Sequence, residues 1–133
     1  MNFNNDFFKK ESREGFEISS MMKRAWAAQM EVFQIVADIC DRNGIRYFAD
    51  WGTLLGAVRH KGMIPWDDDI DISLMRDEYN QLIKILPEQL PHGFVIAGMY
   101  ADSKRLQDAA FVPQLRVIAH EIFSWISISE SWY

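Results

Sequence analysis

The chain has 133 residues, which leaves room for one domain, since single domains hold roughly 100–200 residues. Hydrophobic residues make up 49% of the chain and aromatic residues 14%, and this composition excludes an intrinsically disordered protein. The net charge of −5, without any run of basic residues, excludes an electrostatic surface for nucleic acid.

Cysteine usage and hydropathy indicate the compartment. Cys40 is the single cysteine, so no intrachain disulfide can form, and a reducing compartment is the simpler interpretation. The first residues carry charges throughout and lack the apolar core of a secretory signal. No apolar stretch reaches the roughly 20 residues that cross a bilayer. We therefore expect a cytoplasmic protein without a membrane span, and peripheral association with the inner face of the membrane stays open.

The chain is expected to comprise a lead-in segment, residues 1–18, and one domain, residues 19–133. Periodicity and turn residues predict, in chain order, a helix at 21–42, a strand at 45–49, a helix at 54–60 capped by Thr53, a strand at 69–74, a helix at 76–86 ended by Pro87, and strands at 94–99, 110–119 and 123–128. The last of these is expected at a sheet edge. This order predicts an α+β fold, a small mixed sheet flanked by helices.

The densest cluster of charge is acidic and extends from residue 67 into the strand predicted at 69–74. Four aspartates stand within five positions, namely Asp67, Asp68, Asp69 and Asp71. On a strand, residues two apart share a face, so Asp69 and Asp71 should project together while Asp68 points the other way. Two carboxylates on one face can share a hard divalent cation, because Mg²⁺ is typically held by one or two carboxylates, water and substrate phosphates. A solvated acidic loop is the alternative, which the alternation with Ile70 and Ile72 disfavours.

A calcium-binding loop of the EF-hand type fits this segment poorly. Asp67, Asp69, Asp71 and Glu78 stand at positions 1, 3, 5 and 12 of such a loop. Position 6 requires glycine for its sharp turn, and Ile72 stands there.

A possible phosphate-binding turn precedes the acidic strand. Gly52 lets the backbone approach a ligand closely, and Thr53 adds a hydroxyl at the start of a helix, where exposed amide groups favour phosphate. Arg59, on the same predicted helix, can pair with phosphate through two parallel hydrogen bonds, or alternatively form a salt bridge with the aspartates. His60 is interpreted as a loop or packing histidine.

These residues resemble the LicD family of the nucleotidyltransferase superfamily, to which fukutin-type proteins are related. The resemblance runs through YFADWGTLLGAVRHKGMIPWDDDIDISL, about a quarter of the chain. It implies a nucleotidyltransferase-like fold and a transferase that moves a phospho-group, such as phosphocholine, from a CDP-activated donor to a glycan of the cell surface. It also implies that Asp69 and Asp71 bind the divalent ion, Mg²⁺ or Mn²⁺, and that Gly52 and Thr53 contact the donor phosphates. From its own chemistry, Arg59 is expected to join Gly52 and Thr53 in holding these phosphates.

Two departures from the family's pattern qualify this expectation. Family members are longer, so the domain is expected to be incomplete at its C-terminus. The superfamily also places a third carboxylate on a later strand of the same sheet, where this chain offers only Glu121 and Glu130. The alternative to an active transferase is therefore a catalytically silent domain that binds a nucleotide or a cation. A third hypothesis is a helix-rich interaction domain whose aspartates are only solvated.

Overall fold

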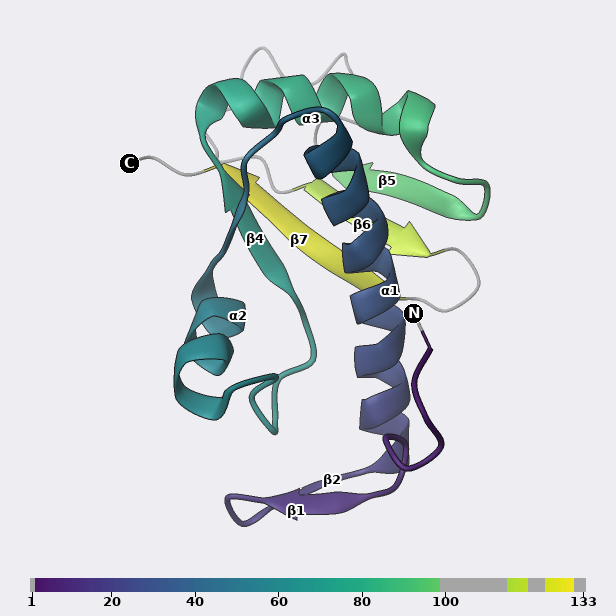
Figure 1. Cartoon of the computed structure of the whole chain (residues 1–133), viewed down its shortest axis with the longest axis vertical. Coiled ribbons are helices and arrows are strands. Elements are labelled where there is room, and N and C mark those ends of the chain that lie inside the picture. Colours follow the sequence, from purple (N-terminus) through teal and green to yellow (C-terminus); the bar gives the residue numbers. More distant parts are fainter. Residues whose placement is uncertain (1, 99–114, 120–123, 131–133) are drawn as a thin grey trace.

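Helix α1 (Ser20–Arg42) runs along one face of a five-stranded sheet in a computed structural model that describes residues 2–98, 115–119 and 124–130 (Figure 1). The Ser19 side chain caps the helix by accepting a hydrogen bond from the backbone N–H of Met22 (3.1 Å). The chain leaves the helix through Asn43 and through Gly44, whose φ of 65° is the left-handed conformation that glycine adopts readily. The helix predicted at 21–42 is thus confirmed.

The sheet is mixed, as predicted. Its strands are β3 (Phe48–Ala49), β4 (Asp71–Leu74), β5 (Phe94–Gly98), β6 (Leu115–Ala119) and β7 (Ser124–Glu130), in the spatial order β3-β4-β7-β6-β5. Only β4 and β7 pair in parallel, with Asp71 beside Ser127 and Ile72 beside Ile128, and the other neighbours are antiparallel. The α+β fold class is therefore confirmed.

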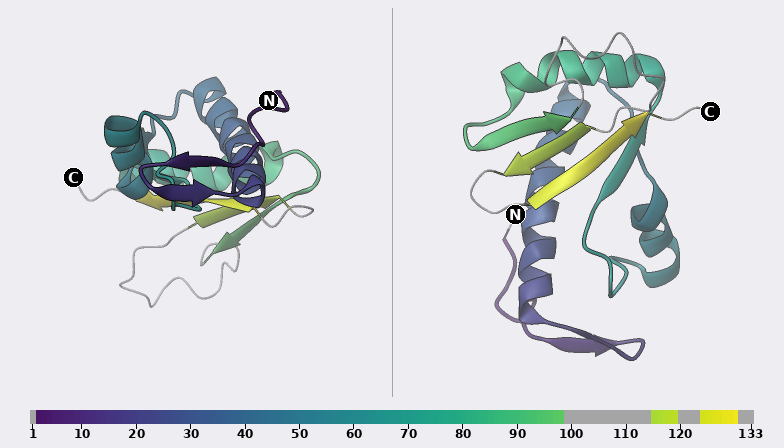
Figure 2. Two further views of the ribbon diagram at one scale, coloured as in Figure 1. Left: turned by 90° about the horizontal axis from the view of Figure 1, so that it is seen from below. Right: turned by 180° about the vertical axis from the view of Figure 1, so that it is seen from behind.

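Two long helices cover the same face of this sheet (Figure 2). Helix α3 (Arg76–Gln89) crosses the end of α1, and the core lies between these helices and the sheet. The fully or nearly fully buried residues of this core include Val32, Val36, Ile39, Ile72, Leu74, Tyr79, Leu82, Leu86 and Ile128. None of the helices in the described residues is long and apolar enough to span a membrane.

The lead-in segment contains a hairpin of β1 (Glu11–Arg13) and β2 (Phe16–Ile18), which lies at the N-terminal end of α1, apart from the large sheet (Figure 1). Ile18 is fully buried, and the Nζ atom of the buried Lys23 lies 2.8 Å from Oε2 of Glu11. The hairpin is therefore docked against the start of α1.

Several predicted bounds differ from those observed. The strands expected at 45–49 and 69–74 are limited to β3 and β4, and α3 continues past Pro87 to Gln89. Pro87 lies in the last helical turn, so its missing N–H removes only one bond close to the helix end. Residues 99, 110–114 and 123 of the predicted strands lie outside the described residues.

The prediction that the last strand lies at an edge is wrong. Strand β7 pairs with β4 on one side and with β6 on the other, so it is an interior strand. The position of β7 within the sheet could not be predicted from the sequence pattern, because strand order depends on pairing between segments far apart in the chain.

The interior position of β7 predicts a large loss of stability from truncation of its buried side chain. Ile128→Ala should lower the free energy of unfolding by about 2–5 kcal/mol, because it leaves a cavity beneath α1 and α3. Val58→Ala, at a side chain that is 64% exposed, should change it by less than about 0.5 kcal/mol. Urea denaturation measures both, and equal small effects would contradict the placement of β7.

Candidate functional site

The turn between β3 and α2 (Trp51–Leu55) is capped by Asp50. Its Oδ1 atom accepts a hydrogen bond from the backbone N–H of Trp51 (2.9 Å), and its carbonyl accepts from the N–H of Leu54 (3.1 Å). The prediction that Thr53 caps a helix at 54–60 is therefore wrong. The helix begins earlier, at Trp51, and continues from Leu55 into η1, a π-helical turn at Gly56–His60.

Thr53 instead bonds across to the acidic strand. Its Oγ1 atom accepts a hydrogen bond from the backbone N–H of Asp71 (2.8 Å), and the Asp71 carbonyl accepts from the N–H of Asp50 (3.1 Å). Both backbone polar groups of Asp71 are therefore satisfied by the turn that contains Gly52. The two sequence features singled out above, the Gly-Thr turn and the acidic strand, are adjacent in the fold.

Gly52 allows the turn to approach the acidic cluster closely. A Cβ atom added at Gly52 would overlap Oδ2 of Asp67, so any larger residue would displace that carboxylate. The absence of a side chain at Gly52 thus sets the distance between the turn and the aspartates.

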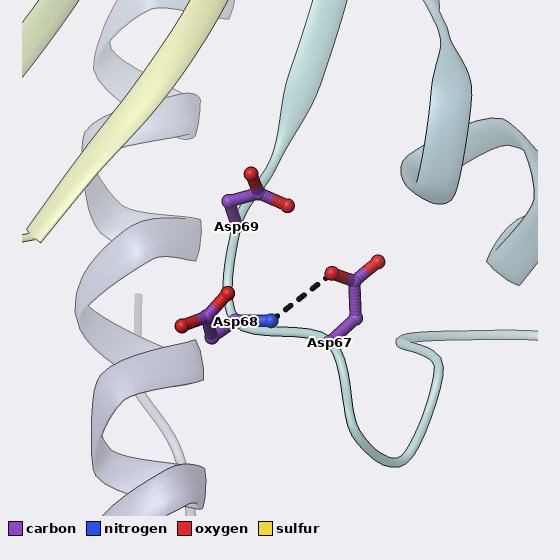
Figure 3. A group of neighbouring side chains, drawn as sticks. All are labelled: Asp67, Asp68 and Asp69. Carbon is purple, nitrogen blue, oxygen red and sulfur yellow. Dashed lines mark hydrogen bonds between the residues drawn. The ribbon is translucent and has the colours of Figure 1, made fainter.

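Asp67, Asp68 and Asp69, on the bend before β4, form one group of carboxylates (Figure 3). Each offers a carboxylate oxygen, and these oxygens all lie within 4.8 Å of one another. The backbone N–H of Asp68 also donates to Oδ1 of Asp67 (3.1 Å). The expectation that Asp68 points away is wrong, because β4 begins only at Asp71 and strand alternation does not extend back to the bend.

Helix α1 anchors this bend through two side chains that the sequence analysis did not assign to the site. The indole Nε1 of Trp26 donates to the carbonyl of Asp67 (2.8 Å), and Nε2 of Gln29 donates to the carbonyl of Asp68. Gln29 is nearly fully buried, and its Oε1 atom has no hydrogen-bond partner among the described residues. A polar residue three positions after Trp26 on a buried helix face was the available signal.

Crowding of like charges changes the titration of Asp69. Burial, the charges of Asp71 and Asp67, and a hydrogen bond with Asp67 raise the pKa of Asp69 from 3.8 to about 6. Asp68 contributes least to this increase. A bound cation would favour the ionised carboxylate, so the site is electrostatically suited to a positive charge.

Arg59 is exposed and lies on η1. Its Nε atom donates to Nε2 of His60 (2.8 Å), and among the described residues it forms no ion pair with Asp67, Asp68 or Asp69. The His60 side chain is 1% exposed and packs edge-on against Trp66, with Nδ1 located 2.9 Å from Oε1 of Glu14. His60 is thus a packing residue, as interpreted from the sequence.

The register of β7 locates the place where a further carboxylate could join Asp71. Ser127 stands beside Asp71, and Glu130 stands beside Leu74, further along the strand. Glu121 lies outside the described residues. No described position of β7 next to Asp71 therefore carries a carboxylate.

The cause of the Asp69 shift can be tested by titration. Asp71→Asn should lower the pKa of Asp69 more than Asp68→Asn, because the Asp71 charge contributes more. Carbon-13 NMR of the side-chain carboxyl groups measures both variants, and equal decreases would contradict the arrangement.

The raised pKa of Asp69 also predicts a pH dependence of stability. Between about pH 4 and pH 6 the Asp69 carboxyl group is protonated in the folded chain but ionised in the unfolded chain, so the stability of the metal-free protein should fall as pH rises through this range.

The Thr53 bond to Asp71 gives a second prediction. Thr53→Val should reduce stability by about 1–3 kcal/mol, because the partly buried N–H of Asp71 loses its acceptor. Thr53→Ser keeps the hydroxyl and should retain most of the stability. Thermal unfolding compares the two, and a larger loss in Thr53→Ser than in Thr53→Val would show that the methyl group, not the hydrogen bond, stabilises the turn.

Comparisons of the sequence with known proteins identify its family. The family model described as LicD/FKTN/FKRP, nucleotidyltransferase domain, matches residues 44–129. The lipopolysaccharide cholinephosphotransferase LicD of Haemophilus influenzae is 53% identical over 47 residues, which are 35% of this chain and 18% of that protein. An uncharacterized protein of Rickettsia prowazekii, RP689, is 39% identical over 71 residues, 51% of this chain and 27% of that protein. Human ribitol 5-phosphate transferase FKRP is 37% identical over 51 residues, 38% of this chain and 10% of that protein. The aligned parts thus span between a tenth and just over a quarter of these curated relatives.

Proposed function

This chain belongs to the LicD/FKTN/FKRP nucleotidyltransferase-domain family, and from that premise we propose that it is a metal-dependent phosphotransferase domain. The donor is a CDP-activated compound such as CDP-choline, from which the phospho-group is transferred, and the acceptor is a glycan of the cell surface. The names of two relatives support this proposal, since one is a cholinephosphotransferase and the other a ribitol 5-phosphate transferase.

The observation that carries the proposal is the contact between the Gly52–Thr53 turn and the acidic bend. Thr53 bonds to the backbone of Asp71, and Gly52 leaves room for the Asp67 carboxylate. Transfer of a phospho-group requires positioning and neutralisation of charge more than covalent chemistry by the protein. The turn would supply the positioning, and a cation held by the carboxylates would supply the neutralisation of charge.

Asp69 and Asp71 are proposed to hold Mg²⁺ or Mn²⁺, with Asp67 next to them. The donor set fits such an ion, because hard divalent cations prefer carboxylate oxygens and because Asp69 has a raised pKa among unneutralised like charges. When bound, the ion would neutralise charge on the donor diphosphate. Gly52 and Thr53 are proposed to contact the donor phosphates, together with the exposed guanidinium of Arg59.

A catalytically silent domain that binds the cation and the nucleotide is the second candidate, and one observation favours it. The position beside Asp71 on β7 is Ser127, whereas family resemblance implies a third carboxylate on a later strand. Loss of one preorganised electrostatic group typically lowers a rate by about 10²–10³. We therefore expect binding by this chain, with slow or absent transfer.

Metal-dependent binding tests the proposal. Calorimetry should show that CDP binds in the presence of Mn²⁺, and that Asp69→Asn or Asp71→Asn weakens Mn²⁺ binding about tenfold or more, because each change removes an anionic ligand. Asp68→Asn should have a smaller effect. Mn²⁺ affinity should also rise between pH 5 and pH 7, since protons compete for Asp69.

The outcomes separate the hypotheses. Equal effects of all three substitutions would indicate a diffuse acidic loop, and absence of Mn²⁺-dependent CDP binding would exclude both the transferase and the silent binding domain. Turnover of CDP-choline with a glycan acceptor distinguishes these two. Robust turnover that Asp71→Asn abolishes would overturn the expectation of slow transfer and would support the phosphotransferase itself.

A further inference from the structure

Every polar group of Asp50 forms a hydrogen bond with a residue of α2 or of β4. Its N–H donates to the carbonyl of Asp71 (3.1 Å), and its own carbonyl accepts from Leu54 (3.1 Å). Its Oδ1 accepts from the N–H of Trp51 (2.9 Å), and its Oδ2 accepts from the hydroxyl of the buried Ser73. One residue therefore connects the first turn of α2 with two positions of β4.

The conformation of Trp51 indicates that this connection holds the turn against strain. Trp51 has a φ of 45°, in the left-handed region, which costs a residue with a side chain about 1–2 kcal/mol. Its side chain is 74% exposed, so packing does not compensate for the strain. Such a conformation persists only where surrounding bonds determine it, and the bond from Trp51 to Asp50 is one of these.

We propose that Asp50 is a positioning residue that holds the Gly52–Thr53 turn in register with Asp69 and Asp71, so that the cation and the donor diphosphate bind as one unit. This inference rests on the proposed function. Asp50 does not itself bind phosphate: both of its carboxylate oxygens already accept hydrogen bonds, and its negative charge would repel a diphosphate.

Positioning predicts a loss of coupling between the two ligands. In the unmodified chain, saturating Mn²⁺ should tighten CDP binding by about tenfold or more, a typical coupling between two linked sites. Asp50→Ala should reduce this factor to about threefold or less while Mn²⁺ alone still binds, because the acidic bend stays anchored to α1. Calorimetric titration of CDP with and without Mn²⁺, well below the unfolding temperature, measures the factor.

Three further variants separate geometry from charge and from folding. Asp50→Asn keeps an oxygen for Trp51, and its amide can donate to Ser73, so it should preserve most of the coupling although the charge is lost. Ser73→Ala removes only one of the side-chain bonds and should give an intermediate factor. Asp41→Ala removes the same charge from an exposed position about 18 Å along α1 from Gln29, and should leave the coupling unchanged.

A readout without ligands tests the connection directly. Hydrogen exchange at the Asp71 amide, followed by NMR, should accelerate about tenfold or more in Asp50→Ala relative to amides of α3, and not in Asp41→Ala. Unchanged exchange at Asp71, full coupling in Asp50→Ala, or loss of coupling in Asp50→Asn equal to that in Asp50→Ala would each overturn the role of Asp50. Absence of Mn²⁺-dependent CDP binding in the unmodified chain would instead overturn the proposed function, and this inference with it.

Discussion

Both backbone polar groups of Asp71 are held by hydrogen bonds to one short segment, to Asp50 and to Thr53 in the first turn of α2, and the candidate site is built around this pair of bonds. The bonds extend the pairing of β3 with β4 into the glycine turn. With them, the start of β4 and the start of α2 occupy fixed relative positions. Pairing of β4 with β7 in the sheet interior then supports this arrangement from the core side.

The acidic bend contains an unfavourable interaction, the repulsion between neighbouring carboxylates. Carboxylates in close proximity repel, and burial together with this repulsion raises the pKa of Asp69. Hydrogen bonds from Trp26 and Gln29 to the backbone of Asp67 and Asp68 hold the bend in position nonetheless. Local strain and charge repulsion that the rest of the structure maintains are characteristic of functional sites.

Local features of the fold could be predicted from the sequence, and features that depend on distant partners could not. The period of apolar residues predicted the bounds of α1 to within one residue, because the apolar face of a helix depends only on the sequence of that segment. The cap at Thr53 was predicted wrongly, because its hydroxyl has a better partner in Asp71, on another element. The interior position of β7 likewise depends on β4, which is distant in the chain.

The candidate site shows the same division. Composition and spacing sufficed to single out Gly52, Thr53 and the aspartates, because few segments combine a glycine turn with so dense an acidic cluster. The orientation of Asp68 was missed because it depends on where β4 begins. Gln29 was missed because its polar contact is visible only once α1 lies against the bend.

We propose that one divalent cation binds where the acidic bend meets the Gly52–Thr53 turn. Paramagnetic broadening of amide signals by substoichiometric Mn²⁺ locates such an ion directly, because the effect falls steeply with distance. We predict that broadening centres on residues 67–71 and on Gly52 and Thr53, while amides of α3 are unaffected. Broadening spread equally over the exposed carboxylates Asp41, Asp77 and Glu88 would contradict the claim.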